Sequence, residues 1–235
     1  MLLVDHLLFA LLGVGLPALL LVGGLRRRAT PLRWTAGMKI RLYYSNGALL
    51  YGLAGLVVAA YWLTGRPLST IGLGWGRVPY DLTAVVLLAG FLLLYMADLA
   101  REAGHDRARG ATRAELARLG FLPVNGREFV HFIFLALAAG VGEEVVYRGF
   151  LITYLEGLLG AGPLATALTL VVPALIFGLA HLYQGWRAVG KIVAMAVLFG
   201  FFYFRTRTLW PLMLVHAAID VLGGLVSWYL LGRRE

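Results

Sequence analysis

Seven long apolar stretches, separated by polar connections, dominate the pattern of the chain. Their approximate limits are 2–24, 46–65, 82–99, 131–158, 163–183, 188–204 and 209–231. A helix needs about 20 apolar residues to cross the hydrocarbon core of a bilayer, and these stretches lack the alternation typical of barrel strands. The pattern therefore predicts an all-α protein, a polytopic transmembrane helical bundle of about seven spans, in a single integral-membrane domain over residues 1–235.

Two segments do not fit a simple span. As one α-helix, the stretch 131–158 would be about 42 Å long, so it must tilt, protrude or break. Gly140 and Gly142 are natural places for a kink or for close helix packing. The connection 100–127 contains Thr112-Arg113-Ala114-Glu115, a capping-box spacing that predicts the start of a short basic interfacial helix. Either segment would add an eighth helix, interfacial or broken.

Composition and charge support a membrane location. The chain is 60% hydrophobic and 14% charged, with no cysteine, which excludes cysteine nucleophiles and thiolate metal sites. Its net charge of +9 comes largely from six Lys and Arg residues in 26–41 and six in 101–127. Both loops lie on one side of a seven-span bundle, so the positive-inside rule predicts a cytoplasmic C-terminus and an N-terminus outside. Basic loops of this kind suit anionic membrane lipids, and a nucleic-acid partner is not expected.

The first stretch is expected to be a retained membrane anchor. Nothing basic precedes it, Arg26, Arg27 and Arg28 follow it, and no small-residue cleavage site is evident. In a prokaryote, the predicted location is the cell membrane.

Charged residues lie inside the fourth stretch, at Glu143, Glu144 and Arg148. Each costs about 2.5–3.5 kcal/mol at the centre of a membrane helix, so pairing must offset much of that cost. Glu144 and Arg148 are four residues apart, which predicts an ion pair on one helical face. Glu143 points about 100° away and has no partner on its own helix, so it suits a base that accepts a proton.

Two histidines lie in other stretches. The fifth ends in Phe177-Gly178-Leu179-Ala180-His181, where Phe177 is expected to pack beside His181, and the seventh contains His216 and Asp220 at helical spacing. A carboxylate one turn away can fix the tautomer and orientation of His216. Two histidines and an unpaired glutamate on three helices can converge only inside the bundle. Their convergence would create a polar cavity able to hold water.

Three motifs occur in order in separate apolar stretches: Glu-Glu-x-x-x-Arg at 143–148, Phe-x-x-x-His at 177–181 and His-x-x-x-Asp at 216–220. Over roughly 128–231, taken as the catalytic core region, the sequence resembles the CAAX prenyl endopeptidase and bacteriocin-processing family, also called the Abi family, of intramembrane proteases. The resemblance implies an endopeptidase acting on a lipidated (CAAX-type, prenylated) or membrane-associated peptide or protein.

The resemblance also implies roles for individual residues. Glu143 and His181 would activate a water molecule, and His216 and Asp220 would contact the developing oxyanion. Glu144, Arg148 and Phe177 would support the site.

One departure concerns Asp220, because eukaryotic prenyl-protease members carry asparagine at this position. An ionised aspartate would repel an oxyanion, so Asp220 is either protonated, or orients His216, or helps to bind a metal. Zinc or another divalent metal, held by Glu143, His181, His216 and Asp220, is the alternative to a metal-free site.

Other classes of function are also open. Chains of Glu, His and Asp serve as proton relays in ion-coupled transporters, although no inverted repeat is evident. A noncatalytic bacteriocin-immunity or scaffold protein would keep the same polar set for packing. Other protease classes lack support, because the chain has neither His-Glu-x-x-His nor Gly-x-Ser-x-Gly.

Overall fold

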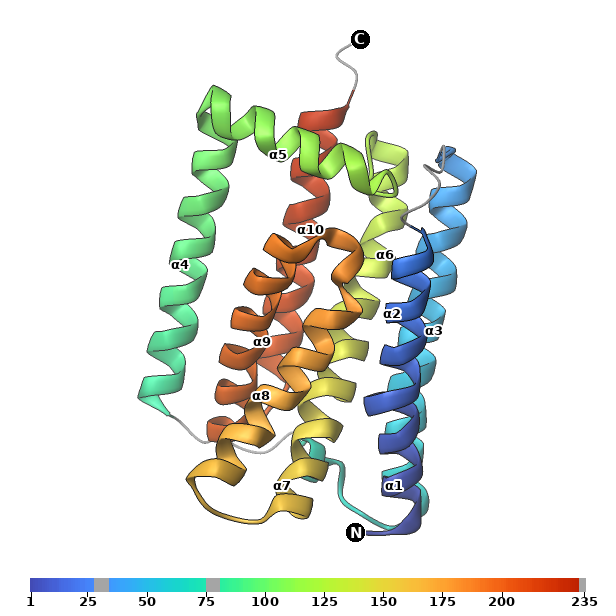
Figure 1. Ribbon diagram of the computed structural model, residues 1–235, viewed down its shortest axis with the longest axis vertical. Coiled ribbons are helices and arrows are strands. Elements are labelled where there is room, and N and C mark those ends of the chain that lie inside the picture. Colours follow the sequence, from blue (N-terminus) through green and yellow to red (C-terminus); the bar gives the residue numbers. More distant parts are fainter. Residues whose placement is uncertain (28–33, 75–80, 233–235) are drawn as a thin grey trace.

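Long helices run side by side along the vertical axis of the computed structural model (Figure 1). The structure describes residues 1–27, 34–74 and 81–232. Among these residues, seven helices are long and apolar enough to cross a membrane, and no strand occurs. The predicted all-α polytopic bundle is confirmed, and the protein is a multi-pass integral membrane protein.

The first span combines two α-helices with a π-helix, and the fourth does the same. The elements in chain order are α1 (Leu3–Phe9), η1 (Ala10–Gly15), α2 (Leu16–Arg27), α3 (Ala36–Leu63), η2 (Leu68–Ile71), α4 (Leu82–Gly104), α5 (Asp106–Leu119), α6 (Gly126–Glu143), η3 (Glu144–Ile152), α7 (Thr153–Leu159), α8 (Pro163–Ala180), η4 (Leu182–Gln184), α9 (Trp186–Thr206) and α10 (Trp210–Leu231). Of these, η1 and η3 are π-helical, and η2 and η4 are short 3₁₀ turns.

The second span begins at Ala36 and not near 46 as predicted. The Thr35 hydroxyl caps it by accepting a hydrogen bond from a backbone N–H of the first turn. Lys39 lies inside this helix, with its Nζ 2.9 Å from a carboxylate oxygen of Glu128 in α6 and 2.8 Å from the carbonyl oxygen of Leu122. A partner 89 positions away in the chain therefore keeps the lysine within the helix.

The fourth span continues unbroken from Gly126 to Leu159 but changes its hydrogen-bonding pattern within η3. Half of the residues in the most apolar part of this span are buried, against 11% for the span in α4, so the fourth span is the central helix of the bundle. A Cβ on Gly140 would lie 2.8 Å from the carbonyl oxygen of Met213 in α10, and one on Gly142 would lie 2.8 Å from the carbonyl oxygen of Leu50 in α3. Both glycines therefore serve close helix packing.

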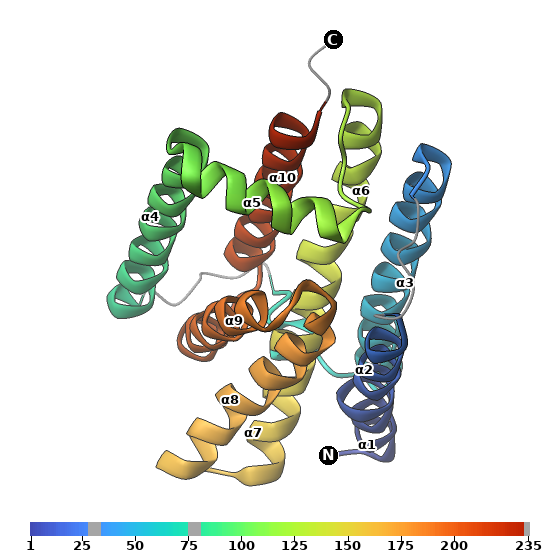
Figure 2. The same cartoon turned by 45° about the horizontal axis from the view of Figure 1, so that its top comes forward.

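The helix α5 lies across one end of the bundle, from the end of α4 toward α6 (Figures 1 and 2). We call this the α5 end. The helix starts at Asp106, so the capping-box spacing predicted at Thr112 lies within the helix and does not begin it. The chain turns from α4 into α5 at His105, where the backbone is extended, and that turn decides the start.

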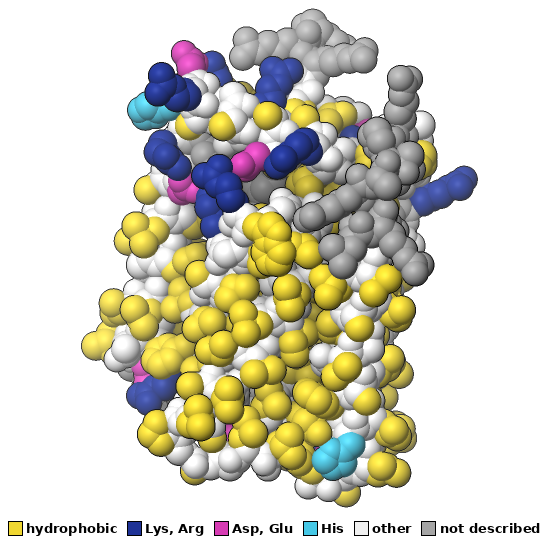
Figure 3. Space-filling model, viewed as in Figure 1, with side chains coloured by type: hydrophobic (Ala, Val, Ile, Leu, Met, Phe, Trp, Pro, Cys, Tyr) yellow, Lys and Arg dark blue, Asp and Glu magenta, His cyan; other side chains and the backbone are white. Residues whose placement is uncertain are grey.

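Charge is distributed unevenly along the bundle. On the face shown in Figure 3, Lys and Arg side chains gather at the α5 end, and apolar side chains cover the middle. Part of the predicted basic loop 26–41, residues 28–33, lies outside the described residues. The apolar middle is the surface expected for helices surrounded by lipid.

Candidate active site

A buried chain of charged side chains lies at the centre of the bundle. Arg148 Nη1 donates to Glu144 Oε1 at 2.9 Å, which confirms the predicted ion pair. The same oxygen is 2.7 Å from His216 Nδ1 on α10. The Glu144 side chain is 0% exposed and that of Arg148 is 2% exposed. Glu144 therefore joins the central helix to α10 through one carboxylate oxygen.

The contact with Glu144 determines how His216 is oriented. A carboxylate oxygen only accepts hydrogen bonds, so Nδ1 of His216 must carry a proton. From the sequence, orienting His216 was one of three alternatives for Asp220, whereas in the structure Glu144, on another helix, holds Nδ1. Asp220 Oδ2 instead lies 3.8 Å from the other ring nitrogen, Nε2. At that distance the two groups do not form a direct hydrogen bond.

The Nε2 atom of His216 faces the open side of the cluster. It lies 3.6 Å from Glu143 Oε2 as well as 3.8 Å from Asp220. The Asp220 side chain is 35% exposed, and Glu143 is also partly exposed. The structure therefore separates the polar set into an enclosed part, Glu144 with Arg148 and His216, and an accessible part, Glu143 with Asp220.

His181 lies directly after α8, where it caps the end of the helix. Its Nδ1 is 2.8 Å from the carbonyl oxygen of Phe177, and a carbonyl only accepts, so Nδ1 carries the proton. In the neutral ring, Nε2 is then left with its lone pair. The expected packing of Phe177 beside His181 is confirmed by a separation of 4.6 Å between ring centroids.

The predicted positions of His181 and Glu143 along the membrane normal differ. The predicted span limits placed His181 near one end of its span and Glu143 near the middle of the membrane. In Figure 1, the turn between α8 and α9 ends well short of α5 and of the upper ends of α6 and α10. The α8–α9 hairpin is therefore set lower than its neighbours. His181 and His216 both contact the ring of Phe177, despite the predicted difference in depth.

Phe177 holds the two histidines around one ring. Its centroid is 6.2 Å from that of His216, in an edge-to-face arrangement, and 4.6 Å from that of His181. The Arg148 guanidinium carbon lies 4.8 Å from the same centroid. Among the described residues, no hydrogen bond or ion pair joins His181 directly to the carboxylates. Phe177 is thus the link between His181 and the charged cluster.

Two neighbours of the site were not singled out from the sequence. Phe199 of α9 packs against His216 and lies under the Arg148 guanidinium. Tyr147 packs its ring edge-to-face on Phe177, with 4.9 Å between centroids. Tyr147 lies four residues after Glu143, and this helical spacing was the available signal. Nothing in the local sequence points to Phe199.

A metal site formed by Glu143, His181, His216 and Asp220 stays a prediction. Across 1–27, 34–74 and 81–232, no group of three or more His, Asp or Glu side chains has the arrangement of a metal site.

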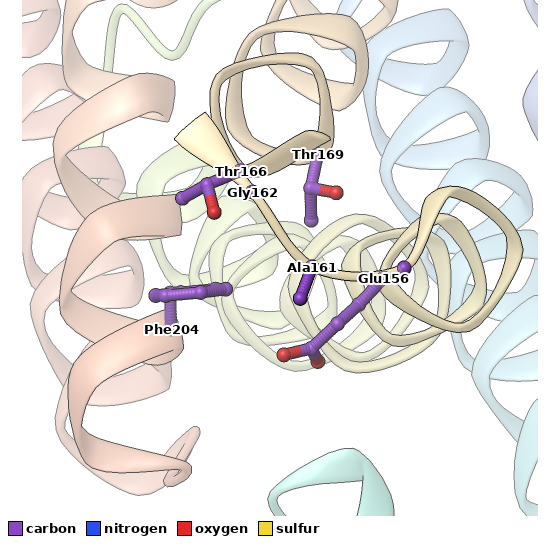
Figure 4. A pocket seen from close by; sticks show the side chains of 7 residues that line it. Glu156, Ala161, Gly162, Thr166, Thr169 and Phe204 are labelled. Atoms are coloured by element: carbon purple, nitrogen blue, oxygen red, sulfur yellow. The ribbon is translucent and has the colours of Figure 1, made fainter. Parts of the chain in front are cut away.

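Cavities are present at the opposite end of the bundle from α5. One of about 210 Å³ lies at the turn between α7 and α8, where Glu156, Thr166, Thr169 and Phe204 line it (Figure 4). A second, also of about 210 Å³, is lined by residues that include Asp5, Tyr61 and Arg66. Neither cavity is lined by a residue of the polar cluster. The two cavities therefore lie apart from the polar cluster.

Comparison with known proteins identifies the region that carries the cluster. Residues 125–222 match the model of the Rce1-like family, described as type II CAAX prenyl endopeptidase Rce1-like. This range contains every residue of the candidate site and agrees with the predicted resemblance. No curated protein and no solved structure matches the chain.

Proposed function

Because residues 125–222 match the model of the Rce1-like type II CAAX prenyl endopeptidase family, we propose that the protein is an intramembrane endopeptidase. Its substrate in this proposal is a prenylated CAAX-type or otherwise membrane-associated peptide. The observation that carries the proposal is the arrangement around His216 Nε2. Glu143, an accessible carboxylate, faces that nitrogen at 3.6 Å, and His181 packs on the same phenylalanine as His216.

In the proposed reaction, Glu143 acts as the general base. A water held between Glu143 and His181 Nε2 loses a proton to the carboxylate while its oxygen attacks the peptide carbonyl carbon. His181 suits this role because its Nδ1–H donates to the Phe177 carbonyl, which leaves Nε2 to accept a hydrogen bond from the water. The proton held by Glu143 then passes to the leaving amine as the C–N bond breaks. The products are a carboxylate and an amine.

His216 is proposed to stabilise the oxyanion. With Nδ1–H directed to Glu144, a second proton on Nε2 would point to the open side, where the carbonyl oxygen becomes negative. Asp220, 3.8 Å from Nε2, attracts that proton electrostatically. In this proposal, Asp220 acts through the imidazole and does not itself touch the oxyanion.

Glu144 and Arg148 are proposed to position the catalytic groups. Their ion pair is enclosed and shares its oxygen with His216, so it fixes the rotation of α10 against the central helix. A site held this way can present His216 without rearrangement during the reaction.

Peptide cleavage by purified protein tests the proposal. The substrate is a synthetic peptide with a farnesylated cysteine near its C-terminus, in liposomes. Wild type should cleave it, and Glu143→Gln and His181→Ala should remain folded but lose at least about 100-fold in rate, in line with the loss of a general base. Lys191→Gln is the matched control, because Lys191 pairs with Asp98 on an exposed surface. Full activity in both site variants would refute the proposal.

Chelator treatment separates the two mechanisms. Unchanged cleavage after EDTA is expected for water activated by Glu143 and His181 alone. A loss that zinc restores would replace this mechanism with a metal-dependent one. If no peptide is cleaved by wild type, proton uptake into the liposomes would instead favour the transporter alternative.

A further inference from the structure

Within the described residues, the hydroxyl group of Tyr147 makes no hydrogen bond, which is unusual for a buried tyrosine. Tyr43, Tyr154 and Tyr203 are also buried, and each hydroxyl hydrogen-bonds to a neighbouring group. For Tyr147, no hydrogen bond is formed with any residue in the described part of the chain. Tyr61 is similar, but it lines the second cavity beside Arg66, far from the polar cluster. A buried phenol without a partner calls for an explanation at its own location.

Tyr147 is located at the candidate active site. It follows Glu143 by four residues, so both side chains leave the central helix on the same face. Its ring packs on Phe177, the ring that also contacts His181 and His216. Tyr147 is 7% exposed, and its oxygen is not among the fully enclosed atoms that lack a partner. The hydroxyl oxygen is therefore not fully enclosed, and its ring lies against the phenylalanine that both histidines contact.

The proposed reaction needs hydrogen-bond donors for the oxyanion, and the predicted site residues supply only one. An oxyanion is stabilised by donors aimed at the oxygen on which charge develops. Glu143, Glu144 and Asp220 only accept hydrogen bonds when ionised, and the Arg148 guanidinium is enclosed against Glu144. This leaves Nε2 of His216 as the sole donor from the predicted set. The phenol of Tyr147 is a neutral O–H donor.

We propose that Tyr147 is a second oxyanion donor, an inference that rests on the proposed endopeptidase function. Its hydroxyl donates a hydrogen bond to the carbonyl oxygen of the scissile peptide bond, next to His216 Nε2. The bond strengthens as water attacks and the oxygen becomes negative. This donor compensates for Asp220, which as a carboxylate cannot supply the hydrogen bond that an asparagine amide would supply.

Tyr147→Phe is the direct test, because it removes only the oxygen and keeps the ring on Phe177. We expect kcat for the farnesylated peptide to fall by about 10²–10³-fold, as for removal of one oxyanion donor, with KM within about threefold of wild type. Thermal unfolding and helicity should not change. Tyr61→Phe removes the hydroxyl of the other unbonded tyrosine and should retain full activity.

Two further measurements separate a catalytic from a structural role. A peptide aldehyde, whose hydrate resembles the tetrahedral intermediate, should bind Tyr147→Phe more weakly, while the cleaved product peptide should bind as it does to wild type. Adding Asp220→Asn to Tyr147→Phe should recover part of the lost kcat, since the amide can donate. Neither result is expected if Tyr147 only packs on Phe177.

The outcomes distinguish this inference from the proposed function. If wild type cleaves, Glu143→Gln does not, and Tyr147→Phe retains kcat within twofold, the donor role of Tyr147 is refuted and the endopeptidase remains. Equal weakening of aldehyde and product binding would also refute the donor role. If wild type cleaves no peptide, both proposals are refuted together.

Discussion

Replacing Arg148 with methionine is expected to destabilise the protein strongly. The substitution keeps an extended side chain but removes the cation that neutralises Glu144, whose side chain is 0% exposed. Removing one partner of a buried ion pair typically costs about 3–5 kcal/mol, because the other charge stays enclosed. That is a large part of the stability of about 5–15 kcal/mol typical of a folded protein. The ratio of folded to unfolded protein should fall by about 10²–10⁴.

The double substitution Glu144→Gln with Arg148→Met tests the physical reason. It removes both charges of the pair, so no uncompensated charge remains enclosed, and most of the lost stability should return. Lys191→Met is the control for removing a cation from an ion pair as such. Lys191 is exposed and Asp98 is partly exposed, so the change should cost less than about 1 kcal/mol.

The assay is reversible unfolding of purified protein in mixed detergent micelles, followed by far-ultraviolet circular dichroism. Each variant is compared with wild type at the same micelle composition. The reasoning is refuted if Arg148→Met lies within 1 kcal/mol of wild type. It is also refuted if the double variant is as unstable as Arg148→Met alone.

Three further predictions concern packing, pH and topology. Gly140→Leu should lower the thermal midpoint, because a Cβ at this position would lie 2.8 Å from atoms of α10. Gly90→Ala is the control, because a Cβ at position 90 has no atom within 4 Å, and its thermal midpoint should match or exceed that of wild type. A thermal midpoint of Gly140→Leu equal to that of wild type would contradict the prediction. The backbone N–H of Ala84 and the Arg205 guanidinium lower the pKa of Asp81 below its ordinary 3.8, so Asp81 stabilises the fold at neutral pH and that contribution is lost as pH falls through the lowered pKa. The difference in thermal midpoint between Asp81→Ala and wild type should therefore shrink below about pH 3.8, and a constant difference would count against it. A cysteine added at the C-terminus of this cysteine-free chain should be shielded from an impermeant maleimide in intact cells, and one at the N-terminus should react; the reverse would overturn the predicted orientation.

The sequence by itself determined the elements and the contacts within each helix. Apolar runs of bilayer length predicted the spanning helices, because the backbone must satisfy its own hydrogen bonds in lipid. Helical spacing predicted the Glu144–Arg148 pair, since residues four apart share a face whatever surrounds the helix. The start of the second span, at Ala36, was missed because Lys39 lies just inside it. A lysine beside an apolar region indicates a helix end unless its distant partner, Glu128, is known.

Contacts between helices were decided by tertiary structure alone. Spacing within α10 suggested Asp220 as the partner that orients His216. In the folded protein, Nδ1 of His216 instead hydrogen-bonds to Glu144, 72 positions away. The close approach at Gly140 brings α10 against the central helix, and Phe177 of α8 brings His181 and His216 to one ring. A periodic pattern specifies which residues share a face. It does not specify how helices rotate and shift against one another, because side chains from several helices settle that together.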